Sequence, residues 1–233
     1  MGNGGSGEIA IVAAPPKVVL FDAVETMFSL RPVAAALEPL GLHVEAVFTR
    51  LLRDGFALAA AGTYEPFRRV AGSAVTALAP QASPEQHDAV LAAFEQLPAH
   101  PDVEPALSLL SEAGITVCAL TNGSSDATVA LLEANGLQDK VERVLSVEEV
   151  QRWKPAPAPY RHALDQLGAD ARDVALVAVH SWDVHGARRA GLTTGWCSRL
   201  EGAYPSIFDP PDVSGPDLVA VATGLLALPA TST

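Results

Sequence analysis

The residues best suited to chemistry in this chain are two carboxylates, a hydroxyl and an amine: Asp22, Thr121, Lys154 and Asp183. Asp22 directly follows a short apolar run, residues 17–21, which predicts a buried strand that ends at the carboxylate. A carboxylate in that position can attack carbon or phosphorus and form a covalent ester. It can equally cap the helix that follows, and Asp22 by itself does not separate these two roles.

The other polar clusters are each open to a similar pair of interpretations. Thr121 and Asn122 follow an apolar run, where they can cradle an anion or cap a helix. Lys154, which precedes a proline, can keep a nearby carboxylate ionised or can be an ordinary surface lysine. His180 and Asp183 follow another apolar run, so a buried histidine and a helix cap are the alternatives to a site. The clusters form one site only if the strands that carry them belong to one sheet.

Apolar runs and helical patterns alternate along most of the chain. Strands are predicted at residues 17–21, 115–120, 143–146, 174–179 and 193–196, and helices at 126–135, 158–167 and 183–190. This alternation predicts an α/β fold with a Rossmann-like parallel sheet whose two faces are covered by helices. Such a sheet binds its ligands at the carboxyl ends of its strands, which is where the polar clusters lie. The proline-rich stretch 204–216 predicts a long irregular loop.

One long segment, residues 30–100, interrupts this alternation and contains no predicted strand. Its apolar residues have helical spacing at 44–60, 66–78 and 84–97, which predicts an insertion of three or four helices. The predicted organisation is a flexible leader at 1–16, a core formed by 17–29 and 101–233, and a helical cap at 30–100. A cap inserted after the first strand stands close to Asp22.

The composition limits the partners that this chain can have. Its 233 residues carry a formal net charge of −12, which argues against nucleic acid because a phosphate-binding face needs clustered lysine and arginine. A small anionic substrate needs only a few local cations and is compatible with this charge. No apolar stretch is long and uninterrupted enough to span a bilayer. Cys118 and Cys197 lie in apolar runs, which predicts buried free thiols and a cytoplasmic location; a homodimer is left open.

The order of the polar clusters, from Asp22 to Asp183, resembles the haloacid dehalogenase (HAD) superfamily, and the resemblance covers about residues 17–226. The segment 177–192, with its Trp-Asp and Gly-Ala pairs, resembles the (S)-2-haloacid dehalogenase branch of that superfamily. The lysine-proline pair followed by Tyr160 is similar to the same branch. The resemblance therefore implies a Rossmann-like core with an inserted cap, and a hydrolase that acts on carbon–halogen bonds.

The cap carries a further feature of this branch. Arg50, with Phe56 nearby, resembles the segment that holds the halide- and substrate-binding arginine, and Arg53, one turn further on, is the alternative. The resemblance thus implies a site between cap and core, where a closing cap excludes water and strengthens electrostatic contacts.

The resemblance also implies a reaction, the hydrolytic dehalogenation of a small 2-haloacid through an aspartyl ester and without a cofactor. Asp22 is then the nucleophile, Lys154 keeps it ionised, and either Asp183 or His180 activates the water that hydrolyses the ester. The substrate-binding residues that the resemblance implies are Thr26, Arg50, Thr121, Asn122, Tyr160 and His180.

Three positions depart from the patterns of the superfamily. Its phosphatases carry a second aspartate two residues after the nucleophile, where this chain has Val24, and a Mg²⁺-binding acidic residue where it has Ala178. Both losses argue against phosphate ester hydrolysis, and so no metal is expected. Glu25 stands where the dehalogenases commonly have glycine. Two alternatives stay open: a Mg²⁺-dependent small-molecule phosphatase that tolerates a residue without an acid at Val24, and a catalytically silent binding protein with this fold.

Overall fold

The computed structural model describes residues 15–229, so nearly all of the leader expected at 1–16 lies outside the described residues. Six parallel strands form one sheet in the order β3-β2-β1-β4-β5-β6. The strands are β1 (Val18–Phe21), β2 (Thr116–Thr121), β3 (Arg143–Ser146), β4 (Val174–Ala178), β5 (Thr193–Cys197) and β6 (Val213–Gly215). The sheet grows outward from β1 in both directions, which is the doubly wound order with its switch point between β1 and β4. The predicted Rossmann-like parallel sheet is confirmed.

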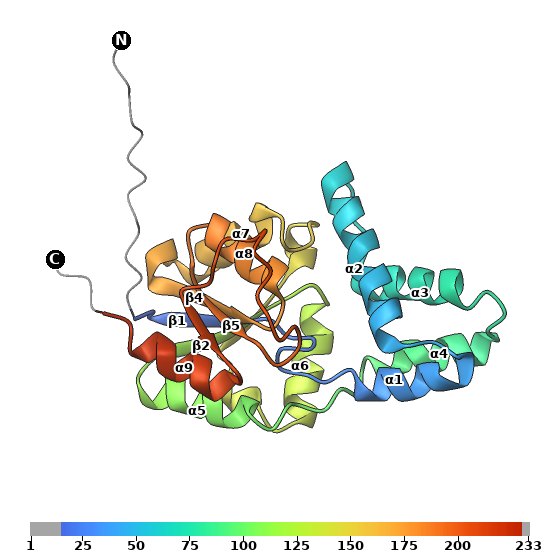
Figure 1. Ribbon diagram of the computed structural model, residues 1–233, viewed down its shortest axis with the longest axis horizontal. Helices are drawn as coiled ribbons and strands as arrows, with labels where there is room; N and C mark the ends of the chain where they lie inside the picture. The colour runs from blue at the N-terminus through green and yellow to red at the C-terminus, as the bar shows by residue number, and fades with distance from the viewer. Residues whose placement is uncertain (1–14, 230–233) are drawn as a thin grey trace, which may run out of the picture.

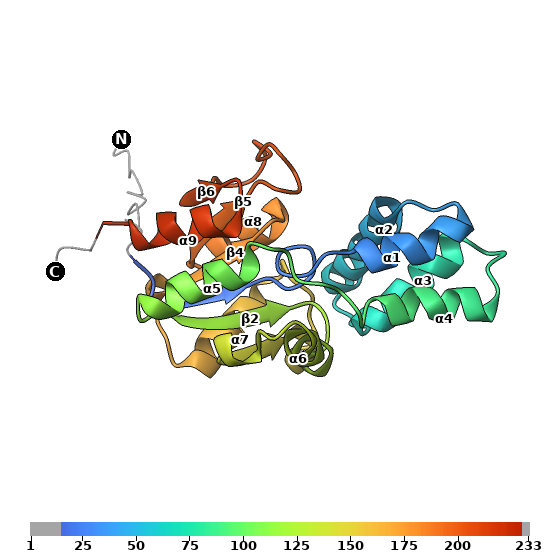
Figure 2. The same ribbon diagram turned by 90° about the horizontal axis from the view of Figure 1, so that it is seen from below.

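Helices cover both faces of this sheet (Figures 1 and 2). The core helices are α5 (Val103–Glu112), α6 (Ser125–Ala134), α7 (Pro157–Leu167), α8 (Ser181–Arg189) and α9 (Leu218–Leu226). Val19 and Phe21 of β1 join the apolar cluster that contains α5 and α9, whereas Leu20 joins the cluster that contains α7 and α8. Successive side chains of a strand point to opposite faces, so a strand that is buried on both faces is apolar throughout. That is why the apolar runs of the sequence located the strands.

Four α-helices follow β1 along the chain and stand to one side of the sheet (Figures 1 and 2). They are α1 (Arg31–Leu37), α2 (Val44–Ala61), α3 (Phe67–Leu78) and α4 (Pro84–Ala93). Local chemistry sets their ends: Ser83 and Gln86 form a capping box at the start of α4, and Gly62 ends α2 at a φ of 81°. All four helices lie within 30–100, the range predicted for the cap.

Trp153 ties this helical cap to the core. Its indole nitrogen donates a hydrogen bond to the carbonyl oxygen of Glu65 at 3.0 Å, and its ring stacks on Phe67 at 5.9 Å between centroids. Helix α2 approaches the same ring so closely that a Cβ atom on Gly55 would lie 2.5 Å from it. Because Lys154 is the next residue, the packing of the cap also fixes the segment that carries this lysine.

The sequence prediction for residues 204–216 was wrong in part, because the stretch contains β6. β6 pairs in parallel with β5, with Val213 opposite Gly195. An edge strand of three residues is too short to show a periodic apolar pattern, and here it forms through backbone pairing to β5. Short 3₁₀ turns complete the fold at Glu38–Leu40, Gln138–Lys140, Val147–Glu149 and Ala171–Asp173.

Within residues 15–229, no helix combines the length and the apolar character needed to cross a bilayer. The longest, α2, has 18 residues and carries the charged side chains of Glu45, Arg50, Arg53 and Asp54.

Candidate active site

Asp22 lies directly after β1, at the carboxyl edge of the sheet and beside the switch point. Its backbone N–H donates to the carbonyl oxygen of Val177 in β4 at 3.0 Å, which fixes the start of the loop that follows β1. Thr26 donates its hydroxyl to Asp22 Oδ2 at 2.7 Å and accepts the backbone N–H of Val179 at 3.1 Å. Thr26 therefore joins the Asp22 carboxylate to the end of β4.

Lys154 is fully buried, and its ammonium has a partner for each of its three protons. Nζ donates to Asp22 Oδ1 at 2.9 Å, to Asp183 Oδ2 at 2.7 Å and to the carbonyl oxygen of Leu120 at 2.7 Å. Its backbone N–H donates to Asn122 Oδ1 at 2.9 Å. Lys154 is thus the bridge between the two carboxylates, and the expectation that its ammonium reaches Asp22 is confirmed.

This bridge sets the protonation states of the pair. Burial raises the pKa of Asp22, but the charge of Lys154 and the hydrogen bond from His180 outweigh burial and hold that pKa well below its usual range. Burial lowers the pKa of Lys154, but the charges of Asp183 and Asp22 more than offset this and raise it above its ordinary value. Asp22 is therefore a carboxylate and Lys154 an ammonium at neutral pH.

Asp183 is completely buried, and both of its oxygens accept hydrogen bonds. Oδ2 receives the bond from Lys154, and Oδ1 receives the hydroxyl of Tyr160 at 2.5 Å. Tyr160 comes this close because Gly186 has no side chain; a Cβ atom there would lie 2.6 Å from the phenol oxygen. Burial, with the charge of Asp183, raises the pKa of Tyr160 well above its ordinary value, so it remains a phenol that donates.

His180 connects Asp22 to a third carboxylate, that of Glu25. Nδ1 of His180 lies 3.2 Å from Asp22 Oδ2, and Nε2 lies 2.9 Å from Glu25 Oε2. The ring is sandwiched between Phe48 of α2 and Trp182, with centroid distances of 6.1 and 5.1 Å. Burial lowers the pKa of His180, but the hydrogen bonds to Asp22 and Glu25 outweigh it and raise the pKa to about 10. The sequence marked Glu25 only as a departure, and no sequence signal linked it to His180.

A narrow cleft lies over Asp22, between cap and core. Its lining consists of Asp22, Val24, Thr121, Asn122, Gly123, His180 and Trp182 from the core, with Phe48, Leu52 and Phe67 from the cap. The free space is only about 10 Å³, but a cavity of about 190 Å³ adjoins it and shares Val24, Phe67, Thr121 and Gly123. Two of these shared residues are joined by a hydrogen bond, in which Thr121 Oγ1 accepts the backbone N–H of Gly123 at 2.9 Å.

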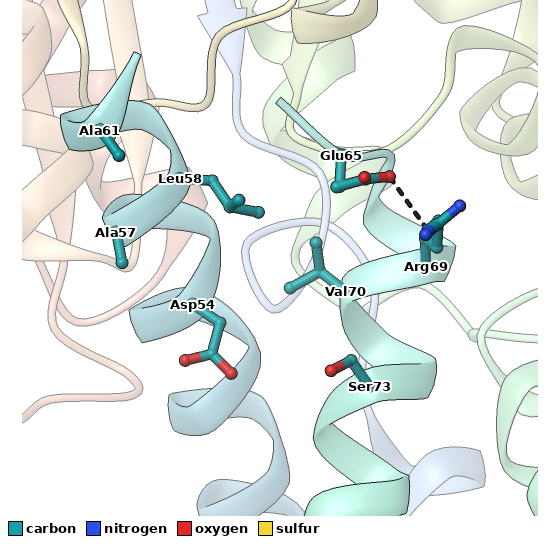
Figure 3. Close-up of a pocket in the computed structure, with 8 residues that line it drawn as sticks. All are labelled: Asp54, Ala57, Leu58, Ala61, Glu65, Arg69, Val70 and Ser73. Carbon is teal, nitrogen blue, oxygen red and sulfur yellow. Dashed lines mark ion pairs between the residues drawn. The ribbon is translucent and has the colours of Figure 1, made fainter. Parts of the chain in front are cut away.

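The structure corrects the assignment of Arg50. Its Nε donates to Asp54 at 2.8 Å, Arg53 contacts the same carboxylate at 2.6 Å, and neither arginine lines the cleft over Asp22. The reason is helical geometry: Phe48 and Leu52 of α2 face the cleft, and a residue two positions from each lies on the other side of the helix. Asp54 instead lines a groove of about 500 Å³ between α2 and α3 (Figure 3), and this groove shares no lining residue with the cleft over Asp22.

The structure therefore brings together every other residue of the predicted site. These residues are Asp22, Thr26, Thr121, Asn122, Lys154, Tyr160, His180 and Asp183. Most of them follow the ends of the parallel strands β1, β2 and β4, whereas Lys154 precedes α7 and Tyr160 lies within it. Together they combine an ionised carboxylate next to a cleft with two buried cations. Such a set can attack an electrophilic carbon and hold the resulting ester.

Comparison with known proteins agrees with this fold. The sequence pattern of the haloacid dehalogenase-like hydrolases matches residues 16–191, and the chain belongs to this family. It is similar to (S)-2-haloacid dehalogenase 4A of Burkholderia cepacia, with 34% identity over 46% of each chain. It is also similar to the (S)-2-haloacid dehalogenase of Xanthobacter autotrophicus, with 30% identity over 79% of this chain and 76% of that one.

The likeness extends to three dimensions. The crystal structure of an L-2-haloacid dehalogenase, 26% identical to this chain, superimposes with a TM-score of 0.85 and covers 92% of this chain and 100% of that one. In sequence, however, several of the dehalogenase relatives match over about half of their length, from 46% to 57%.

Proposed function

We propose that this chain hydrolyses the carbon–halogen bond of a small 2-haloacid through an ester on Asp22. The observation that carries the proposal is the Asp22 carboxylate, which lines the cleft under the cap and is kept ionised by Lys154. A carboxylate is a strong nucleophile where little water surrounds it, and the apolar cap side chains exclude water here. The similarity to (S)-2-haloacid dehalogenases supports this substrate class.

The reaction has two steps. In the first, a carboxylate oxygen of Asp22 attacks the carbon that bears the halogen, and the halide leaves with the bonding electrons. Thr121 and Asn122, which line the cleft, contact the carboxylate of the substrate. In the second, water attacks the Cγ atom of the new ester, which releases the hydroxyacid and restores the carboxylate. Lys154 holds Asp22 in place throughout by its hydrogen bond to Oδ1.

The side chains that surround the departing halide do not include Arg50, the arginine that the resemblance implied. The cap side of the cleft is formed by Phe48, Leu52 and Phe67, and Trp182 of the core completes it. Aromatic rings carry partial positive charge at their edges, which suits a large, weakly hydrated anion. We infer that this apolar wall, in place of Arg50, accepts the halide.

The donor set does not fit the Mg²⁺-dependent phosphatase. The ammonium of Lys154 already bridges Asp22 Oδ1 and Asp183 Oδ2, and neither Val24 nor Ala178 offers a side-chain oxygen as a ligand. Mg²⁺ demands a nearly complete shell of oxygen ligands. Among the described residues, no three His, Cys, Asp or Glu side chains are grouped to hold a metal ion.

A direct comparison of substrates tests the proposal. We expect halide release from 2-chloropropionate, and no phosphate release from an aryl phosphate supplied with Mg²⁺. Phosphate release alone would favour the phosphatase. A folded protein that turns over neither compound would favour a silent binding protein.

Exhaustive removal of divalent cations is expected to leave dehalogenation unchanged, because the Lys154 ammonium supplies the positive charge that a metal would otherwise bring between the two aspartates. The measurement is halide release after treatment with a chelator and transfer to metal-free buffer. Addition of Mg²⁺ to the treated protein is the control. A loss of activity that Mg²⁺ restores would contradict the metal-free mechanism.

Val24→Phe is expected to narrow the range of acids that the chain accepts. Val24 lies between the cleft and the adjoining cavity of about 190 Å³, so a larger side chain would close the space available to a long 2-substituent. We expect kcat/KM for 2-bromohexanoate to fall by roughly tenfold or more, and kcat/KM for 2-chloropropionate to change far less. Val129→Phe, on the exposed surface of α6, is the matched control. Equal losses for both acids would contradict this role.

We further infer a cytoplasmic location and a small anionic substrate as the partner. Cys118 and Cys197 are buried free thiols, and burial raises the pKa of Cys118 to about 11, so it stays in the unreactive thiol form. The net charge of −12 disfavours nucleic acid.

A further inference from the structure

His180, Asp22 and Glu25 form a chain of three groups, and the superfamily resemblance gave no role to Glu25. The imidazole lies 3.2 Å from the nucleophilic carboxylate on one side and 2.9 Å from Glu25 on the other. A nucleophile, an imidazole within hydrogen-bond reach and an acid that orients the imidazole are the parts from which many hydrolases assemble covalent catalysis. Here the nucleophile is a carboxylate, so the imidazole is needed in the second step, when water attacks the ester.

The two candidates for activating that water differ in access to it. Asp183 is completely buried, both of its oxygens are taken by Lys154 and Tyr160, and it is absent from the lining of the cleft. His180 lines the cleft together with Asp22. A general base must come within hydrogen-bond reach of the water whose proton it removes, and His180 meets this condition where Asp183 does not.

The backbone of Glu25 supports the same conclusion. Glu25 adopts a φ of 67°, a left-handed conformation that strains residues with a side chain and is usual for glycine. Arg199 holds this loop through the carbonyl oxygens of Thr26 at 2.7 Å and of Glu25 at 3.4 Å. The side-chain contact that the structure shows for Glu25 is the one with His180. A strained residue whose side chain aims at an active-site histidine fits a functional role.

We propose that His180 is the general base of ester hydrolysis and that Glu25 is the positioning residue that orients it; this inference rests on the proposed function. Ester formation neutralises Asp22, so the imidazolium of the free protein loses one of its two carboxylate partners and releases its proton to solvent. Water then attacks Cγ of the ester while its proton passes to His180. The bond between Cγ and the ester oxygen, which came from Asp22, then breaks, and that oxygen takes the second proton of the water and leaves as the hydroxyl of the product. Asp22 returns to the carboxylate and His180 to the imidazolium.

The charged groups around His180 agree with this sequence of events. Asp22 and Glu25 are its two ionic partners, and Lys154 contacts Asp22 through the other carboxylate oxygen. The side chains that stack on the ring, Phe48 from the cap and Trp182 from the core, are uncharged. The protonation of His180 therefore responds to the charges of Asp22 and Glu25, and ester formation removes the charge of Asp22.

His180→Asn tests the proposal by separating the two steps. With 2-chloropropionate we expect a burst of about one halide per protein chain, followed by a steady rate on the order of 10²–10⁴ lower than that of the unmodified chain. The ester should accumulate and be detected by mass spectrometry on the peptide that contains Asp22. Asp183→Asn should show no such accumulation, because it disturbs Lys154 and thus the first step. Ester accumulation in Asp183→Asn with none in His180→Asn would overturn the proposal.

Glu25 variants provide a test that does not depend on His180→Asn folding. Glu25→Gln should slow ester hydrolysis more than halide release, and Glu25→Gly should do the same while its thermal midpoint stays equal or rises, since glycine tolerates the left-handed backbone. Glu104→Gln, an exposed glutamate paired with Lys140, is the matched control and should behave as the unmodified chain does. If both Glu25 variants hydrolyse the ester at the original rate, Glu25 does not position His180. If the unmodified chain releases no halide, the proposed function fails before this inference is reached.

Discussion

Asp22→Asn is expected to abolish turnover and leave the protein folded, with a loss on the order of 10⁴-fold or more in kcat. The amide cannot form the ester, so no covalent route remains. The fold should survive because the oxygen of the new amide can still accept the hydrogen bond of Lys154, and the apolar core around β1 is unchanged. Halide release and thermal unfolding are the measurements. Asp54→Asn in the cap, which leaves the cleft untouched, is the matched control and should retain activity.

Isotope labelling distinguishes the ester from direct hydrolysis. In water enriched in oxygen-18, a single turnover through the ester should place the label in the Asp22 carboxylate, since water attacks its Cγ atom. The hydroxyacid should then carry the unlabelled oxygen that came from Asp22. Label that appears in the product of the first turnover would mean that water attacks the substrate directly, and the nucleophilic role of Asp22 would be abandoned.

Lys154→Met should produce the second largest effect. Removing one partner of a buried ion pair costs about 3–5 kcal/mol, which corresponds to an activity loss on the order of 10²–10⁴-fold if the whole cost raises the barrier of the reaction. The sign of the pH effect follows from the pKa of Asp22, which burial raises and Lys154 lowers below its usual range. Without Lys154 that pKa rises, so the acid limb of kcat/KM moves to higher pH. The pH–rate profile and the thermal midpoint are the measurements.

Lys154→Arg is the informative companion variant. The guanidinium keeps the positive charge, but its planar fork cannot match three hydrogen bonds to Asp22, Asp183 and the carbonyl oxygen of Leu120. We expect partial activity, with an acid limb close to that of the unmodified chain. Full activity in Lys154→Met, with an unmoved acid limb, would show that the nucleophile does not depend on this lysine.

The sequence located most of the core site because strand ends are visible as local patterns. Asp22, Thr121 and His180 follow buried apolar runs, and a parallel sheet collects the ends of such runs at one edge. Lys154 follows no strand directly; the sequence marked it by the proline that follows it, and the resemblance gave it a role. Its three hydrogen bonds depend on the packing of Trp153 against the cap.

The site residues of the cap were harder to predict, because they depend on which side of each helix faces the core. Apolar spacing predicted the helix that contains Arg50, but it did not say which side faces the core. Phe48 and Leu52 hold the inner face because they are apolar and four residues apart, and this periodicity was a usable signal. Arg50 was assigned by resemblance against that signal, which is why the assignment failed.

The sequence by itself determined the fold class and the order in which polar clusters follow the strands along the chain. It also determined that position 24 is a valine and carries no acid. These features depend only on local composition and chain order. Only the tertiary structure decided which charges meet. The link from Glu25 to His180 spans a long separation in sequence, and it exists because the loop after β1 turns through a left-handed residue. Pairing of this kind depends on distances of a few ångströms between distant segments, and no local pattern encodes those distances.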